Sequence, residues 1–234
     1  MTKGLKPLSL IAVVLVVIGS AGCGSKNATN SNPGPAENPG MGSQSIFADV
    51  IINGSDLSPG SFTTNYTALL LNLFNAPITN AAVSFTHMTL GTIVLTHDAL
   101  FPGTYRASTN GYQTGRYNLS IRRGADSISG AYVSALEIHT ITLPAPNDTL
   151  AMGSSFDVNW TRSYRADTAE VETRDYGPQP TADDGAFTVP TNPTARNDQR
   201  IRVKRFHTLL LAGGRPGSQI RAIIRNSVEP IVVE

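Results

Sequence analysis

The 234-residue chain has a single cysteine, Cys23, so no disulfide can form within it and no zinc site can be built from several cysteines. Charged residues are scarce, at 15% of the chain against about 25% in a typical globular protein. The charges nearly balance, with 18 Lys and Arg against 17 Asp and Glu, which excludes a strongly basic nucleic-acid-binding module. Its most apolar segment, near the N-terminus, falls short of the roughly 20 apolar residues that span a membrane.

That segment has the organisation of an export signal. Lys3 and Lys6 precede an apolar run of 11 residues, Leu8–Ile18, and small residues then lead to Cys23. A positive start, a short apolar run and small residues are typical of a secretory signal peptide. We therefore expect residues 1–22 to be removed from the mature protein.

The segment Ser20-Ala21-Gly22-Cys23 resembles the lipobox of bacterial lipoproteins, with Ser20 at a position where Leu is more common. The resemblance implies that Cys23 becomes the first mature residue and carries a diacylglyceryl group. Two or more acyl chains anchor a protein stably to a membrane. Gly24 follows where an Asp would favour the inner membrane, so the resemblance implies the outer membrane of a Gram-negative envelope. The alternative is an ordinary signal peptide cut near Ala21.

The mature chain opens with a polar segment and continues as a series of strands. Residues 24–44 are mostly Gly, Pro, Asn and Ser, which predicts a disordered tether after Cys23. From Ile46 onward apolar residues recur at every second position, and turn residues separate short runs, which is the pattern of β-strands. The strands expected are Ile46–Asn53, Asn65–Phe74, Ala81–Thr86, Thr92–Thr96, Gly103–Ala107, Arg116–Arg122, Ser127–Ala135, Ile138–Leu143, Ser155–Thr161, Ala169–Arg174, Gly185–Val189, Arg200–Leu211 and Ser218–Val228.

This pattern predicts an all-β fold of two tandem antiparallel β-sandwiches, one over residues 45–136 and one over residues 137–234. The phase of each strand predicts which side chains face the core. Tyr117, Leu119 and Ile121 are expected inside, as are Leu69, Leu71 and Leu73, and Trp160 is expected in the second core.

Two stretches resemble known domain families. Asn80–Val133 resembles the transthyretin-like, carboxypeptidase-regulatory sandwich through Asn80-Ala81-Ala82-Val83, Phe101-Pro102-Gly103-Thr104-Tyr105 and Gly115-Arg116-Tyr117-Asn118-Leu119. Ile138–Arg174 resembles the immunoglobulin-like domain of cell-wall glucan-assembly proteins through Ile141-Thr142-Leu143-Pro144, Gly153-Ser154 and Phe156-Asp157-Val158-Asn159-Trp160-Thr161. Both resemblances imply accessory or adhesive modules and carry over no catalytic residue.

No group of residues predicts catalysis, a cofactor or a metal. The histidines at 87, 97, 139 and 207 lie in no short metal-binding spacing, and no Gly-x-Ser-x-Gly sequence is present. The run Gly213-Gly214-Arg215-Pro216 lacks the ending of a phosphate-binding loop and is expected to be a hairpin connection. Asp175, Asp183 and Asp184 match no calcium loop, and Asp183-Asp184-Gly185 is typical of a turn.

Two features are candidates for ligand binding. Arg200, Arg202 and Lys204 alternate on one expected strand and Arg221 and Arg225 on the next, which predicts a basic stripe for an anionic glycan, lipid headgroup or acidic protein. The alternative is that these cations pair with Glu170, Glu172 and Asp175 on a neighbouring strand. Tyr112, in Asn110-Gly111-Tyr112, is the tyrosine expected to be exposed for stacking on a sugar.

Together these features favour a non-enzymatic, lipid-anchored cell-envelope protein that acts as a binding or scaffolding module. The membrane, through Cys23, is the expected first partner, with an envelope protein or a glycan as a second and no nucleic acid. Two alternatives remain open: a carbohydrate-binding or adhesion module, and an accessory domain protein of an envelope hydrolase.

Overall fold

The computed structural model describes residues 37–58, 61–162, 164, 166–190, 195 and 198–233. The expected signal peptide, Cys23 and residues 24–36 of the expected tether lie outside these residues. The end of the tether was predicted wrongly, because Glu37–Asn38 and Met41–Gly42 are short strands that pair with Asp126–Ala135. Within them the chain is all-β and contains no helix, and so no helix that could cross a membrane.

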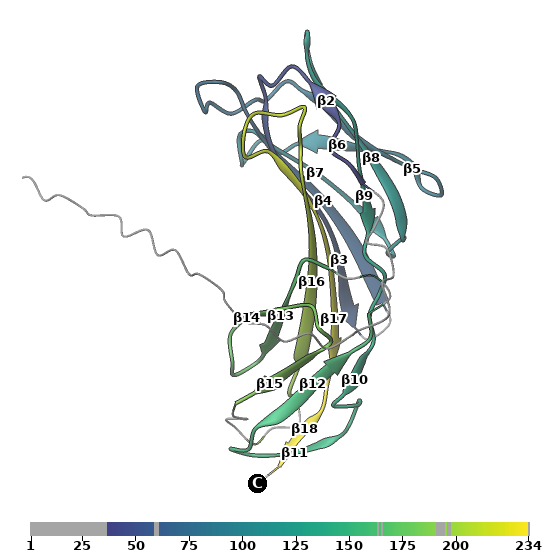
Figure 1. The fold of residues 1–234 in the computed structure, drawn as a ribbon, viewed down its shortest axis with the longest axis vertical. Helices are drawn as coiled ribbons and strands as arrows, with labels where there is room; N and C mark the ends of the chain where they lie inside the picture. The colour runs from purple at the N-terminus through teal and green to yellow at the C-terminus, as the bar shows by residue number, and fades with distance from the viewer. Residues whose placement is uncertain are drawn as a thin grey trace, which may run out of the picture. The chain divides into compact units, whose positions relative to one another are not determined.

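The described residues form the following strands (Figure 1): β1 (Glu37–Asn38), β2 (Met41–Gly42), β3 (Phe47–Ser58), β4 (Ser61–Leu71), β5 (Ala82–His87), β6 (Gly91–His97), β7 (Thr104–Asn110), β8 (Gly115–Arg123), β9 (Asp126–Ala135), β10 (Ile141–Leu143), β11 (Thr149–Ala151), β12 (Phe156–Trp160), β13 (Thr168–Thr173), β14 (Gln179–Thr181), β15 (Ala186–Val189), β16 (Ile201–Leu210), β17 (Gln219–Val228) and β18 (Ile231–Val233).

Every strand expected from the sequence is present, and this confirms the all-β fold. The strands that the sequence analysis did not predict, β1, β2, β11, β14 and β18, have only two or three residues each. Such segments are too short to show alternation, because a period of two needs at least four residues to be recognised.

The inward-facing residues predicted for β8 and the burial predicted for Trp160 of β12 are confirmed. Tyr117, Leu119 and Ile121 of β8 are buried, and Arg116 and Asn118 between and beside them are exposed. The phase of β4 is wrong: Tyr66, Ala68 and Leu70 are buried, whereas Leu73 is exposed. The three consecutive leucines at 69–71 contain no alternation, so Tyr66 and Ala68 decide which face of β4 is inside.

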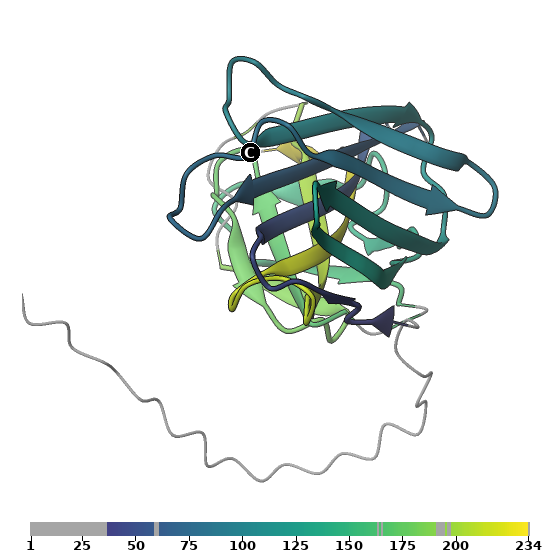
Figure 2. The same cartoon turned by 90° about the horizontal axis from the view of Figure 1, so that it is seen from above.

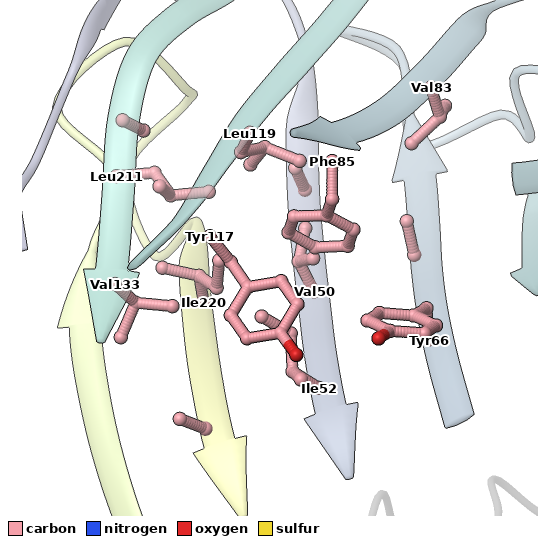
Figure 3. Close-up of a cluster of buried hydrophobic side chains, with 14 of the residues drawn as sticks. Val50, Ile52, Tyr66, Val83, Phe85, Tyr117, Leu119, Val133, Leu211 and Ile220 are labelled. Carbon is pink, nitrogen blue, oxygen red and sulfur yellow. The ribbon is translucent and has the colours of Figure 1, made fainter. Parts of the chain in front are cut away.

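The first sandwich packs the sheet β9-β8-β5-β6 against the strands β7, β4, β3 and β17 (Figures 1 and 2). The two layers are joined where β6 pairs with β7, at Thr96 and His97. Aromatic and branched side chains from both layers meet in the core shown in Figure 3, where Tyr66 lies 5.6 Å from Phe85 and 5.9 Å from Tyr117 between ring centroids.

The second sandwich is smaller. Its outer sheet is β10-β12-β15, which packs on β13, β16 and the end of β17. The core side chains are mostly branched and apolar, with one large aromatic, and comprise Ile141, Val158, Trp160, Ala169, Val171, Val189, Ile201, Val203 and Val228.

The hairpin β16–β17 belongs to both sandwiches. Ile201 and Val228, at one end of the hairpin, lie in the second core, whereas Leu209 and Ile220, at the other end, lie in the first. Strand β17 pairs in parallel with β3, from Gln219 beside Asp49 to Arg225 beside Ser55. A ten-residue strand is about 34 Å long, enough to run through two small cores. The hairpin therefore crosses the domain boundary expected between residues 136 and 137.

Replacing Trp160 tests whether its side chain is packed in the second core. Its side chain is 4% exposed, so replacement by Ala should lower the free energy of unfolding by about 3–5 kcal/mol, through lost burial and the cavity left behind. Urea unfolding of Trp160→Ala and of the milder Trp160→Phe measures the cost. Because the chain has one tryptophan, wild-type fluorescence reports this site alone, and emission typical of a fully hydrated indole would contradict its burial.

Candidate functional site

The five cations of the expected basic stripe lie together on β16, β17 and the residue before β16, with Lys204 directly opposite Arg225. Each of them pairs with a carboxylate. The N–O distances are 3.4 Å for Arg200–Glu229, 3.1 Å for Arg202–Glu172, 2.5 Å for Lys204–Glu170, 3.1 Å for Arg221–Asp49 and 3.5 Å for Arg225–Asp56.

These pairs confirm the alternative interpretation for Glu170 and Glu172, which face the cations from the adjacent strand β13. Asp175 instead accepts a hydrogen bond from Gln199 at 3.2 Å. Partly exposed pairs of this kind contribute about 0–1 kcal/mol each to stability. Since a carboxylate faces each cation, the stripe carries little net positive charge for an anionic ligand.

Tyr112 is buried, at 9% exposure, so the prediction of an exposed sugar-stacking ring is wrong. Its hydroxyl donates to the Leu136 carbonyl at 2.5 Å, and its ring lies 6.4 Å from that of Phe62. Gly54 of β3 makes room for the ring, because a Cβ there would lie 2.1 Å from Tyr112 Cδ2. Burial also raises the pKa of the hydroxyl well above its ordinary value.

The four histidines occupy separate places in the fold. His87 is buried beside Tyr117 and its Nε2 lies 2.9 Å from the Thr114 carbonyl, while His97 packs on Tyr105. His207 lies between two carboxylates, with Nε2 2.9 Å from Glu37 and Nδ1 3.4 Å from Asp167, so it holds β1 against β16. Among the described residues, no group of three or more His, Cys, Asp or Glu is placed to hold a metal ion.

A buried ion pair that the sequence analysis missed lies where the two cores meet. Arg205 of β16 is fully buried and its Nη2 lies 2.7 Å from Asp183 Oδ2. Asp183 also accepts hydrogen bonds from Arg205 Nε at 2.9 Å, the Trp160 indole at 3.0 Å and the Ala166 amide at 2.8 Å. Arg205 donates further to the Tyr164 carbonyl. Trp160 belongs to the second core and Ala166 to the first, so this carboxylate connects them.

The electrostatics of this junction follow from burial and pairing. Burial acts to raise the pKa of Asp183, but hydrogen bonds from Arg205, Trp160 and Ala166 and the charge of Arg205 hold that pKa below its ordinary value. His139, 1% exposed, is kept neutral there: burial, followed by the positive charge of Arg205, lowers the pKa of its imidazole to about 4. These three side chains are enclosed, so none of them faces solvent as a ligand-binding group would.

The exposed feature of the first sandwich is a patch of large apolar side chains on two loops. Leu73 and Phe74 lie on the β4–β5 loop, and Leu100 and Phe101 lie on the β6–β7 loop; we call these four residues the apolar loop patch. Phe74 is 89% exposed and Leu100 84%. Isolated exposed apolar residues are common, but several that gather in one place mark a surface for interaction.

Backbone contacts bring the two loops together. The Leu70 amide donates to the Gly103 carbonyl at 2.8 Å, and a Cβ at Gly103 would lie 3.1 Å from Pro77 Cβ. Polar side chains also fix each loop. Asn72 Oδ1 accepts from the amides of Phe74 at 2.8 Å and Ala76 at 3.1 Å, and Asp98 Oδ1 accepts from the Leu100 amide at 3.0 Å. The loops therefore present the patch in a set conformation.

The sequence analysis expected Leu73 in the core, named Phe101 only within a motif shared with a domain family, and did not single out Phe74 or Leu100. The available signal was the pairing of adjacent bulky apolar residues, Leu73-Phe74 and Leu100-Phe101, with polar turn residues on either side. A half-buried strand would alternate such residues with polar ones.

No protein-family model and no curated protein sequence matches the chain. Among solved structures, it is similar to fibronectin(III)-like modules of Clostridium thermocellum CbhA, with 14% identity over 79% of this chain and 94% of that one and a TM-score of 0.25. It is also similar to the Yersinia pseudotuberculosis adhesin InvE, with 19% identity, 81% and 60% coverage and a TM-score of 0.27. A third similar structure is the BSP domain of a biofilm-associated protein, with 11% identity over 81% of this chain and a TM-score of 0.26. This chain spans 30% of that structure's length. Likenesses at these TM-scores identify neither a family nor a function.

Replacing Asp183 tests how much the buried ion pair with Arg205 contributes to stability. Asp183→Asn keeps the shape but leaves the charge of Arg205 buried without a counter-charge, so the free energy of unfolding should fall by about 3–5 kcal/mol. Glu172→Gln is the matched control, because its pair with Arg202 is partly exposed and should cost less than about 1 kcal/mol. Urea unfolding measures both, and equal costs for the two variants would contradict the role given to Asp183.

His139 should make stability depend on pH. The unfolded imidazole titrates near its ordinary pKa of about 6.5 and the folded one near 4, so the unfolded state binds the proton first as pH falls. Stability is therefore lost on acidification, by about 2 kcal/mol between pH 7 and pH 5. His139→Gln should remove that part of the loss, whereas the control His97→Gln should retain it. A pH profile that His139→Gln leaves unchanged would refute this assignment.

Proposed function

We propose that this chain is a non-enzymatic, lipid-anchored binding module of the bacterial cell envelope, held to the membrane through Cys23. The observation that carries the proposal is the place of the only cysteine. Cys23 directly follows an export-like segment, within a resemblance to the lipobox, and is fourteen residues before the first described strand.

The described part of the chain fits the role of a module that presents a surface. Its buried polar groups at the junction, Arg205, Asp183 and His139, are enclosed, and the pair Arg205–Asp183 connects the two cores. The five cations of the stripe each face a carboxylate. The apolar loop patch, by contrast, is exposed and held in place, so we assign binding to that patch. Gly24 supports the outer membrane as the place of anchoring in a Gram-negative cell.

Binding of a glycan was favoured by an exposed Tyr112. That ring is buried and its hydroxyl donates to the Leu136 carbonyl, so it cannot stack on a sugar. The basic stripe, which also predicted a glycan, pairs with carboxylates.

Cys23→Ala tests the anchor. In cells fed an alkyne-tagged fatty acid, the wild-type protein should incorporate the label and partition into a detergent phase, and Cys23→Ala should do neither, because the chain has no other thiol. Ser20→Leu, which brings the segment nearer to the common lipobox, is the control and should be labelled normally. Unlabelled wild-type protein, or labelled Cys23→Ala, would refute lipidation at this residue.

A further inference from the structure

We propose that the apolar loop patch is a second membrane contact, and that Leu73, Phe74, Leu100 and Phe101 insert into the surface of a bilayer that contains anionic phospholipid. This inference rests on the proposed function only in that the anchor brings the protein to a membrane. It names the partner of the exposed patch.

Exposed apolar side chains are concentrated at this end of the first sandwich. Met41 and Leu210, also exposed, lie at the same end, because Met41 contacts Gly213 in the β16–β17 turn and Arg215 of that turn donates to the Asn72 carbonyl. Half of the large apolar side chains that are exposed among the described residues therefore gather here. Aromatic and aliphatic side chains of this kind bury themselves at the boundary between headgroups and acyl chains.

Arginines surround the patch. Arg106 lies over the ring of Phe101, with its guanidinium carbon 4.9 Å from the ring centroid. Arg215 Nη1 also lies 3.2 Å from Asn75 Oδ1, on the β4–β5 loop, and Arg123 Nε donates to Asn80 at 3.2 Å. Of the nearby carboxylates, Asp98 pairs with Arg106 at 3.3 Å and Asp126 lies on the β8–β9 turn. Three arginines against two carboxylates leave an excess of one positive charge, which favours the phosphates of anionic lipids.

The chemistry of the patch favours lipid over a sugar. Its four side chains carry no hydrogen-bonding group, whereas a site for sugar needs polar groups that bind hydroxyls as well as a surface for stacking. The two loops lie side by side at one end of the first sandwich, because the Leu70 amide donates to the Gly103 carbonyl between them.

The length of chain between the anchor and the fold allows both contacts at once. Glu37 pairs with Val133, and β9 runs from there to Asp126 at the patch end, a distance of roughly 24 Å for seven residues. The fourteen residues from Cys23 to Glu37 can cover roughly 46 Å at full extension. An acylated Cys23 can therefore lie in the same bilayer that the patch contacts.

Depth measurements on the full chain test this proposal. The Cys23→Ala background removes the only thiol, so Phe74→Cys places an environment-sensitive fluorophore on the patch alone. Met88→Cys is the matched control, because Met88 is 97% exposed but lies on the β5–β6 turn. That turn is at the end of β5 and β6 opposite to the two loops that carry the patch. The labelled proteins are mixed with vesicles of phosphatidylcholine and phosphatidylglycerol, with and without nitroxide-labelled acyl chains.

We expect the label at position 74, but not the label at 88, to shift its emission to the blue and to be quenched by the nitroxides. Adding Leu73→Glu and Leu100→Glu to the Phe74→Cys protein should reduce the quenching at least tenfold, and pure phosphatidylcholine vesicles should give a weaker response. Far-ultraviolet circular dichroism checks that these surface changes leave the β-fold intact. Equal responses at 74 and 88, or no effect of the glutamates, would overturn insertion by the patch.

A photocrosslinker at position 74 of the wild-type background distinguishes lipid from a protein occupant in cells. Capture of phospholipid supports the proposal, and capture of a discrete protein overturns it. Because the vesicle experiment uses Cys23→Ala throughout, its outcome is independent of lipidation. Failed fatty-acid labelling would remove the anchor and leave the patch result standing, and a failed patch result would leave the anchor standing.

Discussion

The buried ion pair between Arg205 and Asp183 is the constraint on which the rest of the fold depends. Strand β16 turns its odd-numbered residues inward along its length, and at position 205 that inward residue is a guanidinium. A buried cation is tolerated only when a counter-charge and hydrogen bonds compensate it. Asp183 supplies both, and it is itself held by the Trp160 indole and the Ala166 amide. The requirement to satisfy one cation thus sets the positions of the loop before β13, the loop before β15 and the end of β12.

This constraint explains why two cores can share one hairpin without merging into a single apolar interior. Ile201 and Val203 of β16 lie on one side of Arg205 and Leu209 lies on the other. A polar layer between them keeps the cores distinct, while the covalent continuity of β16 and β17 and the parallel pairing of β17 with β3 keep them together. Gly54 and Tyr112 fill the adjoining space on the side of the first core. Asp183 is held by Arg205, Trp160 and Ala166 together, and Arg205 also donates to the Tyr164 carbonyl, so the pair joins segments of both cores.

The sequence was sufficient to predict the strands and insufficient to predict what lies between them. Alternation of apolar residues identified every strand of four residues or more, because burial of one face imposes a period of two. The leucines at 69–71 carried no such period, and the phase of β4 was mistaken there. Arg205 shared the inward phase of Ile201 and Val203, yet a charge on an inner face has meaning only once its partner, 22 residues away in sequence, is located. Tyr112 was misplaced for a similar reason, since its burial depends on the missing side chain of Gly54 in a distant strand.

A surface is available for binding when its side chains are exposed and have no partner within the molecule. Cations that lie opposite carboxylates, as Arg202 does with Glu172, lose most of their long-range field to their partners. Apolar side chains have no such local compensation in water. The four residues of the apolar loop patch are exposed. Hydrogen bonds to Asn72 and Asp98 hold their two loops in a set conformation, so this exposure belongs to the ordered fold. The free energy that the chain forgoes by leaving four large apolar groups in water is recovered only on contact with a surface that buries them. A bilayer is a surface that can bury all four together, and the anchor that we propose at Cys23, fourteen residues before β1, would bring the chain to one.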